Sequence, residues 1–232
     1  MSGMAYDLIF GRTKRDWSCG SFLVPVKHVE TIVMVRHGEK PVKGLGQLNC
    51  QGINRSMALP HILVAKFGKP RFIFAPNPRP QKNDKGILYD YVRPLATIEP
   101  TAAQLGLPVD TRFGFHDIEG LHGELLSPKY QDATIFVAWE HHLIVDLIKH
   151  LLSRTGGDSS KVPDWKDGDF DSIYVVKVFR TPDGTRSEFF RDRQGLDDLP
   201  LVCPPLHPIN KFALGAACAV MGTFTIIDLF KL

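Results

Sequence analysis

Three short apolar runs, separated by segments with helical periodicity, limit the folds that are open to this chain. The runs are rich in β-branched and aromatic residues, and they comprise residues 31–35 (TIVMV), 71–75 (RFIFA) and 134–139 (TIFVAW). Runs without polar alternation are typical of strands that are covered on both faces. The helical patterns lie at residues 48–67, 94–105 and 141–153. This alternation predicts an α/β fold, namely a three-layer α/β/α sandwich around a mostly parallel sheet.

Local signals refine these expected elements. Asn49 is suited to cap the first helix, because its side-chain oxygen can accept a hydrogen bond from the first turn. Pro60 and Pro100 are expected to kink or break the first two helices, since proline has no N–H to donate. Near the end of the chain, residues 173–179, a TPDG turn and residues 188–190 predict an antiparallel hairpin.

Composition limits the partners that this chain can have. The 232 residues include 28 basic and 25 acidic side chains, which give a formal net charge of +3. A nucleic-acid-binding domain usually carries a strongly basic face, so we expect no nucleic-acid partner. We divide the chain into an N-terminal extension (residues 1–30), one α/β domain (31–198) and a C-terminal extension (199–232).

The two ends of the chain bear on its location. The N-terminal charges follow the first apolar residues, which is the reverse of the order in a secretory signal peptide. The four cysteines at positions 19, 50, 203 and 218 lack CxxC and zinc-finger spacing, so we expect free thiols in a reducing compartment. These features predict a cytoplasmic protein. The uncharged residues 212–227 leave two alternatives open: a tail packed on the protein, or membrane association through residues 212–230.

Two histidines follow the first and third apolar runs. Arg36, His37 and Gly38 come after residues 31–35, and Glu140, His141 and His142 come after residues 134–139. The carboxyl ends of parallel strands meet at one edge of a sheet, where ligands usually bind. Neutral imidazole can attack phosphorus, and the planar guanidinium of arginine matches the oxygens of a phosphate group. The pattern therefore predicts a site in which a nucleophile meets a bound anion.

Four motifs in order resemble the histidine phosphatase superfamily, which has the phosphoglycerate mutase-like fold. They are VMVRHGEK, LNCQGINRSMAL, YVRPLATIEPTA and IFVAWEH, and together the resemblance covers about residues 31–190. The resemblance implies a phosphate site made of Arg36, His37, Arg93 and His141, with His37 as the nucleophile. It also implies a mechanism that needs no metal or other cofactor.

The function implied by the resemblance is hydrolysis of a phosphomonoester through a phosphohistidine intermediate. The substrate would be a phosphorylated small molecule or a phosphoprotein. Two alternatives stay open: a phosphoglycerate mutase-type phosphotransferase, and a non-catalytic phosphate-binding or scaffold protein.

The proton donor to the leaving group is the least certain part of this site. In the family it is a carboxyl group, and the candidates in this chain are Glu140, Asp117 and Glu119. Glu140 is the first choice, although alternation along a strand predicts that it points away from His141. We expect no metal at His141 and His142, since the side chains of adjacent residues diverge and no HExxH spacing is present.

Charged loops complete the expected surroundings of the site. Residues 82–91 predict a polar loop, and residues 167–171 (DGDFD) predict a solvated acidic loop that lacks the full pattern of a calcium-binding loop. Basic side chains are expected to ring the site, either to attract an anion or only as solvated surface groups. They are Lys40, Lys43, Arg79, Lys82 and Lys85.

Overall fold

A six-stranded sheet forms the centre of the computed structural model, which describes residues 28–44, 46–84 and 86–205. Its strands are β1 (His28–Arg36), β2 (Phe72–Phe74), β5 (Val109–Asp110), β6 (Thr134–Trp139), β7 (Ser172–Thr181) and β8 (Gly184–Arg193). The spatial order is β5-β2-β6-β1-β7-β8. The first four strands in this order pair in parallel, and β7 and β8 add an antiparallel hairpin beside β1. The prediction of a mostly parallel sheet is confirmed.

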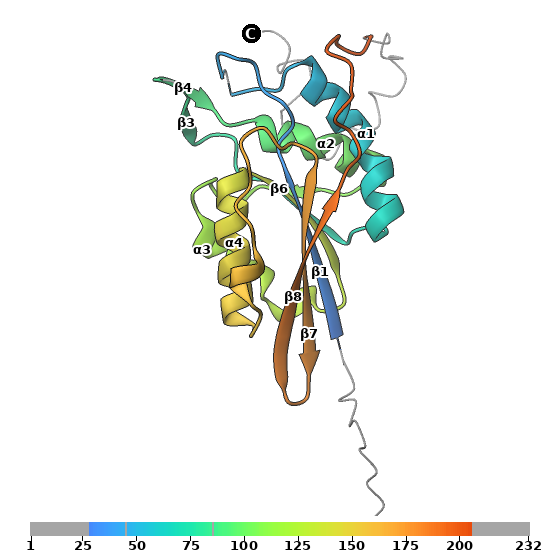
Figure 1. The fold of residues 1–232 in the computed structure, drawn as a ribbon, viewed down its shortest axis with the longest axis vertical. Helices are drawn as coiled ribbons and strands as arrows, with labels where there is room; N and C mark the ends of the chain where they lie inside the picture. The colour runs from blue at the N-terminus through green and yellow to red at the C-terminus, as the bar shows by residue number, and fades with distance from the viewer. Residues whose placement is uncertain (1–27, 45, 85, 206–232) are drawn as a thin grey trace, which may run out of the picture.

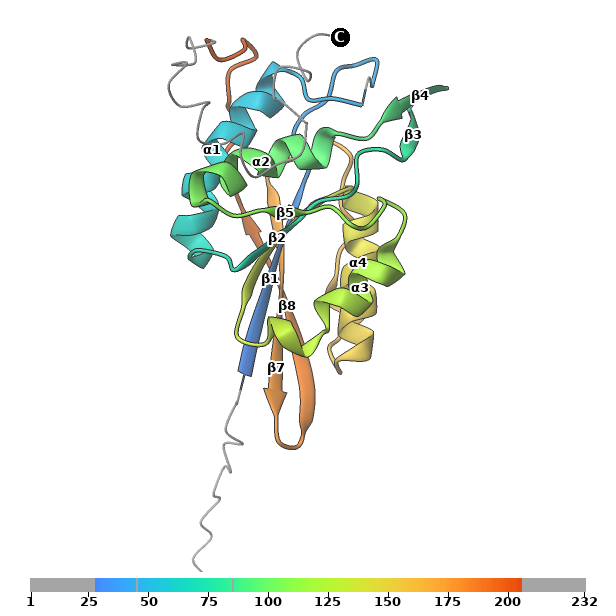
Figure 2. The same cartoon turned by 180° about the vertical axis from the view of Figure 1, so that it is seen from behind.

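Helices cover both faces of the sheet (Figure 1). One face carries α1 (Cys50–Phe67) and α2 (Arg93–Leu105), and the other carries α3 (Ile118–Leu125) and α4 (His141–Arg154). The view from behind shows the same separation of the two helix pairs (Figure 2). Short 3₁₀ turns, Pro128–Tyr130 and Ser159–Lys161, flank α4 in the sequence. The predicted three-layer sandwich is therefore confirmed.

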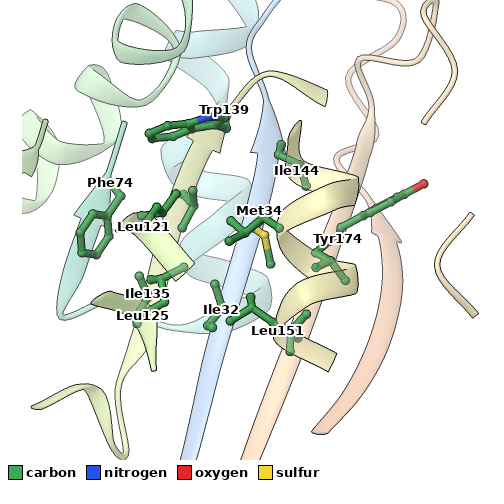
Figure 3. Packing of buried hydrophobic residues seen from close by; sticks show 14 of the residues in the cluster. Ile32, Met34, Phe74, Leu121, Leu125, Ile135, Trp139, Ile144, Leu151 and Tyr174 are labelled. Atoms are coloured by element: carbon green, nitrogen blue, oxygen red, sulfur yellow. The ribbon is translucent and has the colours of Figure 1, made fainter. Parts of the chain in front are cut away.

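The central strand β1 supplies side chains to two separate cores. Ile32 and Met34 belong to the core under α3 and α4, whereas Val33 and Val35 belong to the core under α1 and α2. Figure 3 shows Ile32 and Met34 facing α4. All four side chains are at most 1% exposed, as expected for a strand covered on both faces. Because both faces are packed, only the ends of β1 are left for polar chemistry.

The expected elements are present with small shifts in their bounds. Asn49 caps α1, and its Oδ1 accepts a hydrogen bond from the Gly52 amide at 2.9 Å. The expectation that Pro60 and Pro100 would break their helices is wrong, since α1 and α2 each continue past the proline. One missing N–H removes a single helical hydrogen bond, and packing of the helix against the sheet can outweigh that loss.

The expected polar loop at residues 82–91 is instead mostly a hairpin. Strands β3 (Gln81–Asp84) and β4 (Ile87–Asp90) pair antiparallel and form a separate two-stranded sheet. This hairpin projects beyond the end of the main sheet, near the carboxyl end of β1 (Figure 1). Its residues are mostly polar, so hydrophobic periodicity gives no sign of it.

The prediction of free thiols is wrong for two of the four cysteines. Cys50, at the start of α1, forms a disulfide with Cys203, and their Cα atoms lie 4.3 Å apart. The bond ties the segment after β8 to α1 across 153 positions of sequence. Disulfides are typical of oxidising compartments, which weighs against the expected reducing one. Cys19 and Cys218 lie outside the described residues.

The expected tail also lies outside the described residues. The described chain ends at residue 205, before the uncharged segment 212–227, and it begins at residue 28, within the expected N-terminal extension. Among the helices of the described part, none is long and apolar enough to span a membrane.

Candidate active site

Both histidines predicted from the strand ends lie at one edge of the sheet. In the parallel register of β1 and β6, Arg36 lies opposite Trp139, and the His37 amide donates a hydrogen bond to the Trp139 carbonyl at 3.1 Å. His141 follows two residues after Trp139 as the first residue of α4. The register of two neighbouring strands therefore brings the two sequence motifs together.

Hydrogen bonding fixes the tautomer of His37, and burial favours its neutral form. Its Nδ1 donates to the Gly38 carbonyl at 2.7 Å, which leaves Nε2 as the nitrogen with the free lone pair. The side chain is 2% exposed. Burial, and then the positive charge of Arg93, hold the pKa of His37 well below its usual range. His37 is therefore neutral at physiological pH, as attack on phosphorus requires.

Close backbone contact holds the turn after His37. A Cβ on Gly38 would lie 3.0 Å from both the Cα and the carbonyl oxygen of Gly52 in α1, so a larger residue would push the two segments apart. The Gly38 amide donates to Thr97 Oγ1 at 2.8 Å, and the Thr97 hydroxyl donates to the Arg93 carbonyl at 2.8 Å. These contacts link the turn after His37 to the first turn of α2, where Arg93 lies.

A buried ion pair anchors Glu39, the residue after Gly38. Glu39 accepts hydrogen bonds from Arg55 Nε and Nη2, the shortest at 2.6 Å, and Arg55 is completely buried. Arg55 Nη1 also donates to the side chain of Gln194 at 2.8 Å. Arg55 thus joins the turn after His37 to α1 and to the segment that follows β8.

Two buried arginines supply positive charge around His37. Arg36 is 3% exposed and Arg93 is 1% exposed. Arg36 Nη1 donates to the carbonyls of Asp167 at 2.6 Å and Asp169 at 3.1 Å, while its buried Nε has no hydrogen-bond partner among the described residues. Arg93 Nη1 donates to the Gly44 carbonyl at 3.3 Å. The positive charges of both guanidinium groups lower the pKa of His37, so they lie near enough to favour an anion bound beside it.

His141 lies between two carboxylates. Its Nε2 is 2.8 Å from Asp167 Oδ1, and its Nδ1 is 2.9 Å from Glu140 Oε1. Glu140 caps α4 through a 3.0 Å hydrogen bond from the Leu143 amide, and its Oε1 is 3.9 Å from Lys82 Nζ. Glu140 is 6% exposed and lies beside His141, so the expectation that it points away is wrong.

The protonation state of Glu140 bears on its predicted role as the acid. Burial raises its pKa, but the contacts with His141 and the Leu143 amide, together with the charge of Lys82, outweigh burial and bring the pKa to about 2. Glu140 is therefore charged at neutral pH and holds no proton to donate. Its geometry suits it to orient His141 instead.

The acidic loop at residues 167–171 is more than a solvated loop. Asp167 has a side chain that is 86% exposed, yet its carboxylate contacts His141 and its carbonyl contacts Arg36. The Phe170 ring lies 4.0 Å from the Arg36 guanidinium carbon and 6.2 Å, between ring centroids, from His37. The loop thus lies against the buried His37. It also contacts Arg36 and His141, two of the residues that the resemblance assigns to phosphate.

The other two acid candidates take no part in these contacts. Asp117 caps α3 by accepting a hydrogen bond from the Gly120 amide at 3.0 Å, and Glu119 borders a hollow lined by His122 and His150. Within the described residues, neither carboxylate forms an ion pair with Arg36 or His141. The structure therefore brings together Arg36, His37, Arg93, Glu140 and His141, but neither Asp117 nor Glu119.

Comparison with known proteins finds distant structural likenesses only. No family model and no curated protein matches this sequence. A mycobacterial glucosyl-3-phosphoglycerate phosphatase, solved with inorganic phosphate, is 17% identical with a TM-score of 0.47 over 69% of this chain and 95% of its own. A phosphoglycerate mutase from Plasmodium falciparum is 13% identical with a TM-score of 0.45 over 78% of this chain and 98% of its own. Because both TM-scores are below 0.5, these likenesses carry no argument, and the functional assignment depends on the residues of the site.

Several residues at the site carried no signal in the sequence. Tyr91 is completely buried, and its ring lies 4.9 Å from both the Arg93 guanidinium carbon and Lys82 Nζ. Asp167 and Phe170 lie far along the chain from both histidine motifs. Of the expected basic side chains, Lys82 lies at the site, and Lys85 is outside the described residues. Only the short spacing between Tyr91 and Arg93 could have suggested any of these contacts.

Proposed function

We propose that this protein hydrolyses phosphomonoesters by transferring the phosphoryl group first to His37 and then to water. The observation that carries this proposal is the buried, neutral His37, whose Nδ1 is fixed by the Gly38 carbonyl and whose neighbours are Arg36 and Arg93. The superfamily resemblance of the four motifs supports the same assignment. The proposal names the reaction and the substrate class, which is a phosphorylated small molecule or a phosphoprotein. It does not name one substrate.

The proposed cycle has two steps. His37 Nε2 attacks phosphorus, the bond from phosphorus to the ester oxygen breaks, and the leaving oxygen takes a proton from solvent or from an acid. Water then attacks the phosphohistidine, which releases inorganic phosphate and restores neutral His37. The transferring group spreads negative charge over its oxygens, and Arg36, Arg93 and His141 would stabilise that charge. The cycle uses no metal or other cofactor.

Bound phosphate has to replace a protein anion in this site. The Asp167 carboxylate is 2.8 Å from His141 Nε2, so it stands where an oxygen of the phosphoryl group would be. Likewise, the carbonyls of Asp167 and Asp169 accept hydrogen bonds from Arg36 that phosphate oxygens would otherwise accept. Because the Asp167 side chain is 86% exposed, it can turn into solvent when substrate arrives. Glu140 stays as the buried anion that orients His141.

Hydrolysis of para-nitrophenyl phosphate tests this function. An aryl phosphate is chosen because its leaving group departs without a proton donor. We expect His37→Ala to lower kcat/KM by at least about 10³-fold, as loss of a covalent nucleophile does. The matched control is His61→Ala, a change of an exposed histidine on α1, which should keep full activity. A chelator should not affect the rate.

Two results would oppose the proposal. Activity that persists in His37→Ala would rule out the phosphohistidine. A protein that binds phosphate or vanadate but turns over neither aryl nor alkyl phosphates would favour the scaffold alternative. Transfer of the phosphoryl group to an added sugar alcohol in place of water would favour the phosphotransferase.

A further inference from the structure

The histidines that begin α4 do not diverge as their sequence predicts. The ring centroids of His141 and His142 lie 4.0 Å apart, and the ring planes differ by 35°. Both Nε2 atoms face the same carboxylate oxygen, Asp167 Oδ1, at 2.8 Å for His141 and 3.4 Å for His142. Ligand-capable atoms of Glu140, His141 and His142 also lie within 4.8 Å of one another. Two imidazoles and one carboxylate thus converge at the exposed edge of the site.

A buried carboxylate behind His141 prepares its Nε2 for a metal. Glu140 Oε1 is 2.9 Å from His141 Nδ1, within ion-pair distance although not in hydrogen-bond geometry, and the Leu143 amide donates to the other oxygen of Glu140 at 3.0 Å. A negative carboxylate beside one ring nitrogen favours the proton on that nitrogen and leaves the lone pair on the other. This arrangement is usual for histidines that bind zinc. Glu140 is 6% exposed and is therefore well placed to act from behind the ring.

The two distances from Asp167 Oδ1 to the imidazole nitrogens are close to those around a small transition-metal ion. Zinc bonds to histidine nitrogen and carboxylate oxygen are about 2.0–2.2 Å long, so donors around a tetrahedral ion lie roughly 3.3–3.5 Å apart. The 3.4 Å distance between His142 Nε2 and Asp167 Oδ1 already meets this spacing. The 2.8 Å distance between His141 Nε2 and Asp167 Oδ1 would have to lengthen by about half an ångström. Asp167 and His142, at 86% and 65% exposure, have room for that movement. A water molecule or a phosphate oxygen would complete the fourth position.

We propose that His141, His142 and Asp167 form a binding site for a transition-metal ion such as Zn²⁺, and that the bound ion inhibits the enzyme. The inhibitory part rests on the proposed function, in which His141 stabilises the charge of the phosphoryl group. A metal bound to His141 Nε2 would prevent that contact. Imidazole ligands favour zinc over magnesium or calcium, which prefer oxygen. The ion is thus a regulator of the site and takes no part in the catalytic cycle.

Metal binding is tested without substrate. Equilibrium dialysis of the full chain against ZnCl₂ at pH 7.5 should give a site that His142→Ala weakens by at least about tenfold. Co²⁺ should give the visible absorption of a tetrahedral complex in the wild type, and that absorption should be lost in His142→Ala. The matched control, His61→Ala, should bind zinc and cobalt like the wild type. Equal zinc affinity in His142→Ala and wild type would overturn the proposed site.

Inhibition is tested with the aryl phosphatase assay. Without metal, His142→Ala should hydrolyse substrate like the wild type, because His142 has no part in the proposed cycle. Added ZnCl₂ should inhibit the wild type and the His61→Ala control, should inhibit His142→Ala at least about tenfold less, and should be reversed by a chelator. Zinc binding at this site without inhibition would overturn the regulatory role. Zinc binding in a protein without any phosphatase activity would instead count against the proposed function and leave the metal site intact.

Discussion

Strand β1 carries a buried ionisable side chain at each end, and the two are held in different ways. Near its start, Glu30 is completely buried and accepts a 2.9 Å hydrogen bond from Arg180, a residue of the neighbouring strand β7. At its end, Arg36 is 3% exposed and donates to carbonyls of the loop that contains Asp167. The first partner is fixed within the sheet, whereas the second belongs to a surface loop.

This difference separates a structural contact from one that the proposed function would exchange for a ligand. Replacing Arg180 as the partner of Glu30 would require a change in the sheet itself. In the proposed function, a shift of one loop would replace the carbonyls that contact Arg36 with phosphate oxygens. Burial alone therefore does not distinguish a ligand-binding group in this protein, and the proposal depends on where its partner lies.

The largest expected effect contrasts the two arginines. Arg36→Met should lower kcat/KM for an aryl phosphate on the order of 10²–10³-fold, because one donor to the transition-state charge is lost. Arg180→Met should leave kcat/KM within about twofold, since Arg180 contacts Glu30 and the Leu126 carbonyl at the opposite end of β1. Steady-state kinetics on both variants, with circular dichroism to verify folding, measures the contrast. Equal losses of activity would remove the distinction between the two ends.

The next effect is on stability and concerns Glu30. Burial raises its pKa from 4.5 to about 8, against the opposing charge of Arg180. The folded protein thus holds a proton on Glu30 that the unfolded chain releases above about pH 4.5. This contribution to stability is fully present below pH 4.5 and is lost as the pH rises through 8. The shift corresponds to roughly 3–5 kcal/mol across that range.

Glu30→Gln should remove this part of the pH dependence. Glutamine keeps the acceptor for Arg180 and carries no titrating group, so the free energy of unfolding should fall less steeply between pH 5 and 8.5 than in the wild type. Denaturant unfolding at several pH values measures the difference. Glu188→Gln, a change of a 45% exposed carboxylate on β8, should keep the wild-type profile. An unchanged slope in Glu30→Gln would mean that Glu30 is charged in the folded state.

Local sequence patterns predict five of the six strands of the main sheet and most of the proposed site, but neither the two-residue strand β5 nor α3. The run at residues 31–35 is apolar because both faces of β1 are packed, and that pattern is visible without a structure. Strand ends then locate Arg36, His37 and His141, because parallel neighbours end at the same edge. Arg93 was identified only through the family resemblance, since it begins a helix and follows no strand of the main sheet.

Contacts that depend on loop conformation were beyond such patterns. Asp167 reaches His141 through the path of a loop 26 positions later in the chain, and no periodicity encodes that path. The stacking of His141 on His142 depends on how α4 begins, with Glu140 as its cap. The pairing of Cys50 with Cys203 depends on where the segment after β8 returns to α1. Each is a tertiary contact with no short-range signal.

The smallest expected effect concerns the Asp167 carboxylate, the anion that His141 contacts in place of phosphate. Asp167→Asn removes the negative charge that competes with substrate at His141, so KM and the inhibition constant of vanadate should fall. Solvent weakens the interactions of so exposed a carboxylate, so the change should be at most about fivefold and should shrink at high salt. Asp164→Asn, at a 96% exposed position in the same segment, is the matched control and should leave both constants unchanged. A rise in KM for Asp167→Asn would mean that this carboxylate helps to bind substrate. The loop at the end of β1 would then be a required partner, as Arg180 is for Glu30 near the start of the strand.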